Sequence, residues 1–336
     1  MKSWPSLQDW NPDGTPSAVT IGMFDGVHRG HQALLSLLNH EARKRDLRTV
    51  ALTFDRHPRE LITGRPVHGY LTPLPEKLQL LSECGLAHCI VLSTSEDILN
   101  MDAADFVTNV LVEKLSARLV VIGYDFRFGH GRHGDFALLG RMARQSGYTV
   151  LKSEAVIASG SPIKSTRIHQ CLDSGDMGAV AELMGRRYSM SGEVIAGDRI
   201  GRQLGFPTAN VMYPHDKKLP APGVYAGVAC LAEMRWPAAI NLGRRPTVSS
   251  ASGLLLEAHL PGFSGDLYGQ RLTLEFVERL RNEQSFPNVG ALREQIQRDT
   301  AAVLARAERW ERQLVDGWPG PGDPLHITPA AAGEGG

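Results

Sequence analysis

The sequence predicts an α/β protein built in two parts, a parallel β-sheet flanked by helices and then a small all-β barrel or sandwich with a terminal helix. Two patterns indicate this. Apolar strand-like segments alternate with amphipathic helical segments in the first half, and short alternating strands with frequent turn residues follow after about Gly185. The length of 336 residues is also more than one typical core accommodates and favours about two domains.

The first half reads as a β-α-β-α series, which predicts parallel strand pairing because each helix carries the chain back across the sheet. The strand at 119–123 is apolar throughout, as expected for a strand covered on both faces. Strands are expected at 18–24, 49–54, 89–92 and 119–123, and helices at 33–43, at 76–82 and from Phe106 to Leu115.

The second half changes to strand periodicity. Leu272, Leu274 and Phe276 share one face of a strand, and other strands are expected at 190–195, 224–231, 238–242 and 254–260. A last helix is expected at 289–314, with a buried stripe formed by Val303, Ala307, Trp310 and Leu314. We therefore predict domains at 1–185 and 186–316, and a disordered tail at 317–336 that is rich in Gly, Pro and Ala.

The charge balance argues against a nucleic-acid or membrane-surface partner. Lys plus Arg and Asp plus Glu both total 36, whereas such partners usually require a basic excess. No apolar run approaches about 18 residues, and the first residues lack the apolar segment of a signal peptide. The four cysteines, Cys84, Cys89, Cys171 and Cys230, form no CxxC pair, so free thiols and a cytoplasmic location are expected.

The segment TIGMFDGVHRGHQALL is the most specific feature of the first half. A strand ends near Phe24, a glycine-containing turn follows, and a helix opens at about Gly30. Such a turn directs backbone N–H groups and a helix N-terminus at one place, which suits a phosphate. His28 and His31 are three residues apart and can face the same anion. Metal ligation and helix capping are the alternative roles of this histidine pair.

GMFDGVHRGH resembles the HxGH signature of nucleotidyltransferases, and in particular the adenylyltransferase half of bacterial bifunctional riboflavin kinases/FAD synthetases. TFDRHPRE, LTPLPEKLQLL, VVIGYDFRFGHGRHGD and KSTRIHQCLDSGD extend the resemblance over the first 180 or so residues. It implies a Rossmann-like domain in which the FMN phosphate attacks the α-phosphate of ATP and pyrophosphate leaves. Positioning and charge stabilisation then suffice for catalysis.

The resemblance also implies a role for each matched residue. The phosphates of ATP would be bound by Gly22, Phe24, Asp25, His28 and His31, and the pyrophosphate by Ser165, Thr166 and Arg167. The flavin or adenine would lie near Asp55, Asp125, Phe126 and Arg127. For Asp55 and Asp125, loop capping is an equally good interpretation.

One motif departs from the family pattern. Where the family reads like SSTRIR, this chain reads KSTRIH, so that Lys164 replaces a serine and His169 replaces an arginine. An arginine fork on a phosphate contributes about 1.5–3 kcal/mol, which corresponds to roughly tenfold to a hundredfold in rate. Adenylyl transfer is therefore the activity that this departure affects.

The segment GDRIGRQLGFPTANV opens the β-rich half. Gly197, Gly201 and Gly205 punctuate a tight loop before an extended segment. Thr208 and Asn210 are two residues apart on that segment, so their oxygen atoms point the same way and can hold Mg2+. A plain turn-forming role is the alternative for this pair.

GVYAGV, INLGRRPTV, LLLEAHLPGF, DLYGQRLTLEFVERLRNEQSF and LREQIQRD follow in order, and together they resemble a riboflavin kinase domain over about residues 186–310. The resemblance implies a Greek-key barrel, Mg2+ on Thr208 and Asn210, and phosphate contacts at Gly197 and Gly205. Glu257 would be the base for the ribityl hydroxyl and Arg281 would orient the flavin or a phosphate. Ion pairing with other residues is the alternative for both side chains.

These motifs predict a bifunctional enzyme that makes FMN from riboflavin and FAD from FMN, with ATP and Mg2+ as co-reactants. They do not indicate an oligomeric state. Two alternatives stay open. One is a riboflavin kinase whose adenylyltransferase half is weakened or lost, which the His169 departure motivates. The other is a flavin-binding or sensing protein without turnover, which Thr208, Asn210 and Glu257 argue against.

Overall fold

The computed structural model describes residues 1–315, except for 12, 66, 68, 198–200, 202–203 and 245–253. By its internal contacts the chain forms two compact units. We call them the sheet unit, which holds Met1–Arg65 and Glu76–Val156, and the barrel unit, which holds Pro66–Pro75 and the described chain from Ile157 to Val315. The predicted tail at 317–336 lies outside the described residues.

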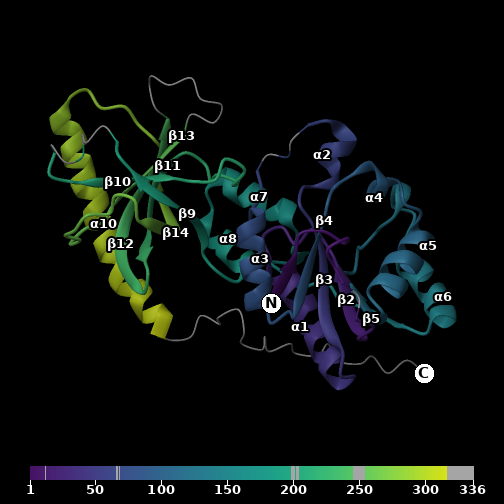
Figure 1. Cartoon of the computed structure of the whole chain (residues 1–336). Helices are drawn as coiled ribbons and strands as arrows, with labels where there is room; N and C mark the ends of the chain where they lie inside the picture. Colours follow the sequence, from purple (N-terminus) through teal and green to yellow (C-terminus); the bar gives the residue numbers. More distant parts are fainter. Residues whose placement is uncertain are drawn as a thin grey trace. The chain divides into compact units, whose positions relative to one another are not determined.

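The sheet unit is a six-stranded sheet in the order β1-β4-β3-β2-β5-β6 (Figure 1). Every neighbouring pair is parallel, as the alternation of strands and helices predicts. The strands are β1 (Lys2–Trp4), β2 (Ser17–Ile21), β3 (Arg48–Phe54), β4 (His88–Leu92), β5 (Ala117–Ile122) and β6 (Thr149–Lys152).

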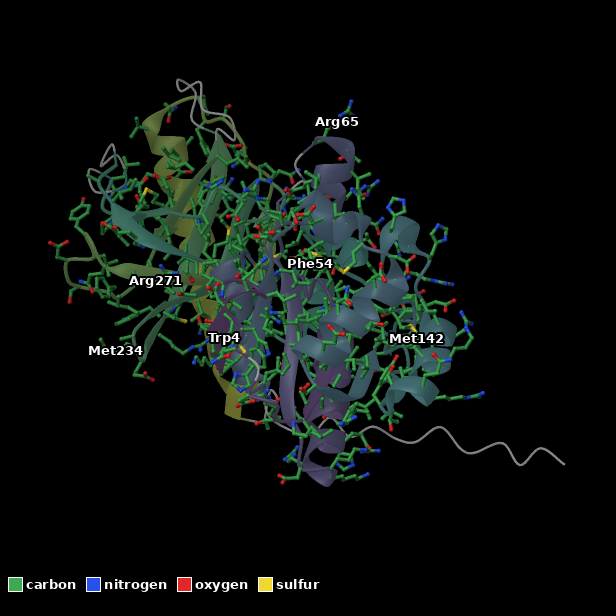
Figure 2. The ribbon with its side chains drawn as sticks, turned by 45° about the vertical axis from the view of Figure 1, so that its right-hand side comes forward. Trp4, Phe54, Arg65, Met142, Met234 and Arg271 are labelled. Atoms are coloured by element: carbon green, nitrogen blue, oxygen red, sulfur yellow. The ribbon has the colours of Figure 1, made fainter. Side chains whose placement is uncertain are left out.

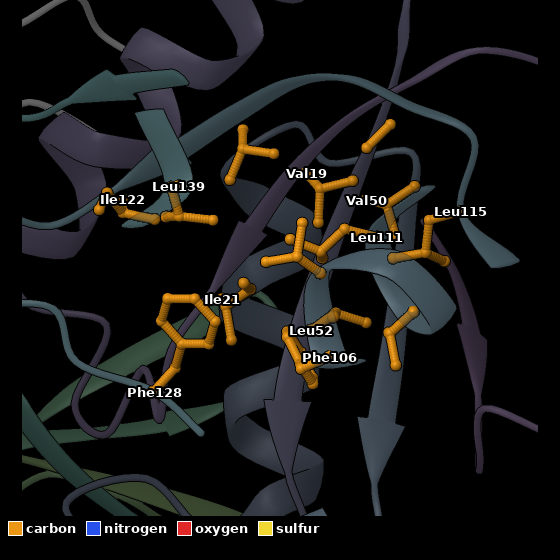
Figure 3. Close-up of a cluster of buried hydrophobic side chains, with 14 of the residues drawn as sticks. Val19, Ile21, Val50, Leu52, Phe106, Leu111, Leu115, Ile122, Phe128 and Leu139 are labelled. Carbon is orange, nitrogen blue, oxygen red and sulfur yellow. The ribbon is translucent and has the colours of Figure 1, made fainter. Parts of the chain in front are cut away.

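Helices cover both faces of this sheet, which explains why its central strands are buried along almost their whole length. Leu35 and Leu38 of α1 (Arg29–Lys44) and Leu81 of α3 (Leu74–Glu83) pack on one face. On the other face, Phe106 and Leu139 belong to the same buried cluster as Ile21 and Leu52 (Figure 3). The remaining helices are α2 (Pro58–Thr63), α4 (Glu96–Asn100), α5 (Ala103–Asp105), η1 (Phe106–Lys114), η2 (His130–Arg132) and α6 (Phe136–Ser146).

The helix expected from Phe106 is present, but its turns are wider than α-helical ones. At its C-terminal end the Leu115 N–H donates to the Val110 carbonyl, five residues back. The predicted apolar face is still buried, and it consists of Phe106, Val107, Val110 and Leu111. The wider turns do not move these residues off that face, because adjacent residues remain close together in an α-helix and in a wider helix alike.

The barrel unit contains a closed antiparallel barrel in the order β10-β13-β12-β11-β14-β9. Leu272, Leu274 and Phe276 are fully buried inside it, as the alternation predicts, and the Phe276 ring lies 5.1 Å from that of Tyr225. The strands are β9 (Tyr188–Ile195), β10 (Thr208–Met212), β11 (Gly223–Leu231), β12 (Met234–Arg244), β13 (Leu254–His259) and β14 (Arg271–Arg281). Met234 stands at the exposed end of the β11–β12 hairpin (Figure 2).

Helix α10 (Val289–Val315) covers the outside of this barrel (Figure 1). Val303, Ala307 and Trp310 are buried against Ala226 and Val228 of β11, which confirms three positions of the predicted stripe. The Leu314 side chain lies outside the described part of the chain. The unit also holds a two-stranded hairpin and two helices, which are β7 (Ile157–Ala158), β8 (Ser161–Pro162), α7 (Ser165–Ser174) and α8 (Met177–Met184).

Candidate active sites

The turn between β2 and α1 is held in a strained backbone conformation. Phe24, Gly26 and Val27 have φ values of 50°, 85° and 36°, in the left-handed region that only glycine adopts readily. A Cβ at Gly22 would lie 3.1 Å from the Phe24 ring, so only a glycine leaves that ring its full room. Left-handed non-glycine residues cost about 1–3 kcal/mol each and cluster at functional sites. The turn predicted from the sequence therefore has the backbone of a ligand-binding loop.

His28 caps α1, and this capping role leaves the predicted contact with a phosphate possible. The His28 Nδ1 accepts a hydrogen bond from the His31 N–H at 3.3 Å. In the neutral imidazole the proton then lies on Nε2, which is a donor suited to an anion. The two rings stack at 3.7 Å, and α1 has no acidic residue in its first turn to oppose an anion.

Asp55 follows β3, beside the Gly-His turn, because β3 and β2 are neighbours in the sheet. Its Oδ1 accepts from the Thr94 N–H at 2.8 Å and from the Arg56 N–H at 2.7 Å. Burial alone would raise the pKa of Asp55, but these hydrogen bonds outweigh it and hold the pKa below its usual value. One carboxylate oxygen thus has the loop-capping role that the sequence left open.

The YDFRFG segment follows β5, on the other side of β2. The Phe126 ring stacks on Phe128 at 5.5 Å. Arg127 donates to Asp135 at 2.8 Å, and Asp135 in turn caps α6. Asp125 is exposed in the same loop. Because β3, β2 and β5 are adjacent and parallel, Asp55, the Gly-His turn and this segment all lie at the carboxyl edge of the sheet.

Sequence reasoning missed two basic side chains at this edge, His57 and Lys77. His57 caps α2 through its Nδ1, which accepts from the Arg59 N–H at 3.0 Å. Burial lowers the pKa of His57, and the Asp25 charge acts against that shift. Lys77 of α3 is only 3% exposed, although its sequence context is that of an ordinary helix surface. Only the tertiary structure reveals this burial.

Ser165, Thr166 and Arg167 belong to the barrel unit, where α7 begins at Ser165 as expected. Lys164 is the N-cap residue and makes no side-chain capping bond. The Arg167 Nη1 donates to the Ala158 carbonyl at 2.7 Å, so this guanidinium supports the β7–β8 hairpin. Like any α-helix, α7 presents backbone N–H groups at its first turn, and such groups can donate to an anion.

In the barrel, Thr208 and Asn210 project outward from β10, because Ala209 and Val211 between and beyond them are buried inside. Asn210 lies directly opposite Glu257 on β13. Glu257 is in turn opposite Asn241 on β12. Directly opposite side chains share a face at about 4.5–5.5 Å between Cβ atoms. The predicted metal ligand and the predicted base are therefore neighbours.

Glycines pack tightly on this pair of polar side chains. A Cβ at Gly197 would lie 2.2 Å from the Asn210 Nδ2, and one at Gly201 would lie 3.2 Å from the Thr208 Oγ1. Asn210 is 5% exposed, and its Oδ1 is buried with no hydrogen-bond partner in the described part of the chain. Gly205 is exposed with φ of 87°, a conformation that favours glycine. A buried amide oxygen beside a hydroxyl fits a hard cation such as Mg2+.

Arg281 has a structural partner in the helix that covers the barrel. Its Nη2 donates to the Asp299 Oδ2 at 2.8 Å, and its Nε contacts both carboxylate oxygens. Asp299 is 7% exposed and also accepts from Gln295. Arg281 therefore forms an ion pair with Asp299, as the alternative interpretation of this residue held, and the pair connects β14 to α10.

A parallel sheet with a histidine-containing glycine turn, together with a barrel that carries an oxygen-donor pair beside a carboxylate, is the architecture expected of a nucleotide-dependent transferase. A family model described as FAD synthetase matches residues 11–167, and one described as riboflavin kinase matches residues 184–306. The chain belongs to the family of bifunctional riboflavin kinases/FMN adenylyltransferases.

Curated relatives of that name match most of the chain. The one from Escherichia coli (strain K12) is 38% identical over 282 residues, which is 84% of this chain and 90% of the relative. The one from Pseudomonas fluorescens is 35% identical over 90% of this chain and 96% of its own length. The one from Haemophilus influenzae is also 35% identical, over 86% of this chain and 93% of its own length. Both catalytic domains are thus present in one chain.

A solved structure titled as a macrolide-efflux protein from Streptococcus pneumoniae has a similar fold, with a TM-score of 0.80 and 25% identity. The match covers 90% of this chain and 98% of the other. Among the described residues of the present chain, no helix is both long and apolar enough to cross a membrane.

Proposed function

We propose that this chain converts riboflavin to FAD in two ATP-dependent steps. The barrel unit phosphorylates riboflavin to FMN, and the sheet unit adenylates FMN and releases pyrophosphate. The observation that carries the proposal is the register of β10 and β13, which places Asn210 opposite Glu257. Family membership, with a matching domain in each half of the chain, supports both steps.

In the first step, Glu257 removes the proton from the ribityl 5′-hydroxyl. The hydroxyl oxygen bonds to the γ-phosphorus of ATP and ADP leaves. Thr208 Oγ1 and Asn210 Oδ1 are the ligands that would hold Mg2+, and this ion supplies charge neutralisation to the phosphates. Gly197 and Gly201 carry no Cβ beside Asn210 and Thr208, which leaves room for the phosphates to approach the bound ion.

In the second step, a phosphate oxygen of FMN attacks the α-phosphorus of ATP. The bond to the β-phosphate oxygen breaks, and pyrophosphate leaves. No covalent enzyme intermediate is needed, so the sheet unit acts by positioning and charge stabilisation. The Nε2–H groups of His28 and His31 donate to the phosphates. Asp55, Asp125 and Phe126 border the flavin or adenine at the same edge of the sheet.

The test is an incubation of the purified protein with riboflavin, ATP and Mg2+, after which the flavins are separated by chromatography. FMN followed by FAD is the expected result. A second incubation starts from FMN, so that the two steps are measured separately. The absence of both products would overturn the proposal in favour of a flavin-binding protein without turnover.

A riboflavin kinase with a weakened adenylyltransferase half is the second candidate, and His169 favours it. This residue lies on α7 where the family motif has an arginine. A His169→Arg variant restores the bidentate donor and should raise FAD formation from FMN by about tenfold or more. FMN formation from riboflavin should not change. Equal FAD formation by variant and wild type would show that this position does not limit adenylyl transfer.

A further inference from the structure

Lys77 connects the ends of two neighbouring strands in the sheet unit. It lies on α3 and is 3% exposed. Its Nζ donates to the Phe54 carbonyl at 2.9 Å, at the end of β3. The same Nζ donates to the Met23 carbonyl at 3.2 Å, in the turn that follows β2. One ammonium group thus ties the Gly-His turn to the loop that begins with Asp55.

Burial of an ammonium group is unfavourable, so a lysine at this position is expected to do more than fill space in the core. Burial lowers the pKa of Lys77, while the charges of Asp25 and Asp55 act in the opposite direction. An apolar side chain would fill the same face of α3, as Leu81 does one turn further on, without this cost. The two carbonyl contacts are what a lysine adds at this place.

The contact with Met23 fixes the orientation of the peptide that joins Met23 to Phe24. The same carbonyl also accepts from the Thr53 Oγ1 at 3.2 Å. Because the C=O and N–H of a trans peptide point in opposite directions, the Phe24 N–H is directed away from Lys77. This N–H has no acceptor among the described residues.

The Phe54 contact obeys the same geometry and serves as a check on it. The Phe54 carbonyl points to Lys77, and the N–H of the next residue, Asp55, donates to the Leu92 carbonyl at 3.1 Å on the opposite side. In that loop the opposite N–H has a partner in the sheet. In the Gly-His turn the corresponding N–H is left for a ligand.

We propose that Lys77 is a positioning residue for adenylyl transfer, which orients the Met23–Phe24 peptide so that the Phe24 N–H donates to a phosphate of ATP. The proposal rests on the function proposed for the Gly-His turn. It adds a residue that touches no reacting atom and acts through the backbone. Its failure would leave that function intact, because FAD synthesis by wild type is measured separately.

The test compares Lys77→Met with wild type in FAD formation from FMN. Loss of one oriented N–H donor costs about 10²–10³-fold in rate, and we expect kcat/KM for ATP to fall by at least about 10²-fold. The KM for FMN should change little, because Lys77 contacts only the phosphate turn and the end of β3. FMN formation by the barrel unit should be unchanged and shows that the chain is folded. The matched control is Lys114→Met, an exposed lysine of the same unit.

A second variant tests the route through the carbonyl. Thr53→Val removes the other donor to the Met23 oxygen and keeps the side-chain volume, so it should lower kcat/KM for ATP in the same direction by about tenfold. The double variant should lose less than the product of the two effects, because both act on one peptide. If Lys77→Met does not fold, Thr53→Val alone provides the test. Wild-type kcat/KM for ATP in either folded variant, or independent effects in the double variant, would overturn the proposal.

Discussion

Asn210 and Glu257 face each other across β10 and β13 on the outer surface of the barrel. The register of the two strands fixes the positions of the buried Asn210 amide oxygen and the Glu257 carboxylate. Neither residue lies on a loop. A site on strands is held more precisely than one on loops. The kinase step that we propose would therefore depend on residues whose spacing follows from the barrel itself.

Replacement of Glu257 by glutamine should remove the base and keep the shape of the site. General-base catalysis contributes about 10²–10⁴-fold, so FMN formation from riboflavin should fall by about 10³-fold. FAD formation from supplied FMN should be unchanged. Glu193→Gln, at an exposed position on β9, is the matched control. If Glu257→Gln keeps wild-type FMN formation, the carboxylate is not the base.

Gly197→Ala tests the close approach of the glycine loop to the metal ligand. The new Cβ would lie 2.2 Å from the Asn210 Nδ2 and 2.6 Å from its Cγ, so the amide has to move. We expect FMN formation to fall by about tenfold to a hundredfold and to require more Mg2+, as a titration with Mg2+ would measure.

Gly140→Ala is the control for this substitution, because it adds a Cβ with no heavy atom within 4 Å in the middle of α6. It should stabilise the protein by about 0.5–1 kcal/mol and leave FMN formation unchanged. A Gly197→Ala variant with the wild-type dependence on Mg2+ would mean that Asn210 does not hold the ion.

Arg281 and Asp299 offer a test that separates a flavin contact from a structural ion pair. Their side chains are 20% and 9% exposed, and removal of either partner leaves the other buried without its counter-charge. Arg281→Met and Asp299→Asn should each lower the free energy of unfolding by about 2–4 kcal/mol. Denaturant unfolding measures this loss.

The KM for riboflavin distinguishes the two roles. If Arg281 only ties β14 to α10, both variants should change this KM equally little. A KM that rises in Arg281→Met and not in Asp299→Asn would instead establish the flavin contact that the sequence suggested.

The strands of the fold could be predicted from the sequence because each carries its own burial pattern. β5 is apolar on both faces from Leu119 to Ile122, and Leu272, Leu274 and Phe276 alternate along β14. Both patterns can be recognised without knowledge of the neighbouring strands. β1 was missed, since Lys2–Trp4 has no such pattern and becomes a strand only by pairing with β4, far along the chain. The same holds for β10, whose five residues were recognised only as an extended segment.

The candidate site residues likewise differ in whether they could be recognised from the sequence. Short motifs marked His28, Thr208 and Asn210, because their chemistry depends on local spacing. Lys77 was missed because its burial arises from two strand ends that meet it in space. The partner of Arg281 could not be predicted either, since Asp299 reaches it only after α10 has packed on the barrel. The predicted domain boundaries and location stay predictions.

His88 should make the stability of the sheet unit depend on pH. This residue begins β4 and so lies far from the carboxyl edge of the sheet. The Trp4 Nε1 donates to the His88 Nδ1 at 3.4 Å, and the Trp10 ring lies 5.3 Å away, so a neutral ring fits this place. Burial lowers the pKa of His88, with further lowering by Arg48, Lys2 and the N-terminus and an opposing effect of Asp13.

The sign of the effect follows from this shift. A histidine in the unfolded chain titrates near about pH 6.5, so above that pH the ring is neutral in both states and its full contribution to stability is present. As the pH falls, the unfolded chain takes up the proton first, and the free energy of unfolding declines until the folded-state pKa is passed. The protein should thus be less stable at about pH 5.5 than at about pH 7.5. His88→Gln still offers an acceptor to Trp4 and should reduce this difference, as urea unfolding at both pH values would measure. His40→Gln, at an exposed position on α1, should not reduce it. If both variants keep the wild-type dependence on pH, the neutral His88 ring does not stabilise the docking of β1.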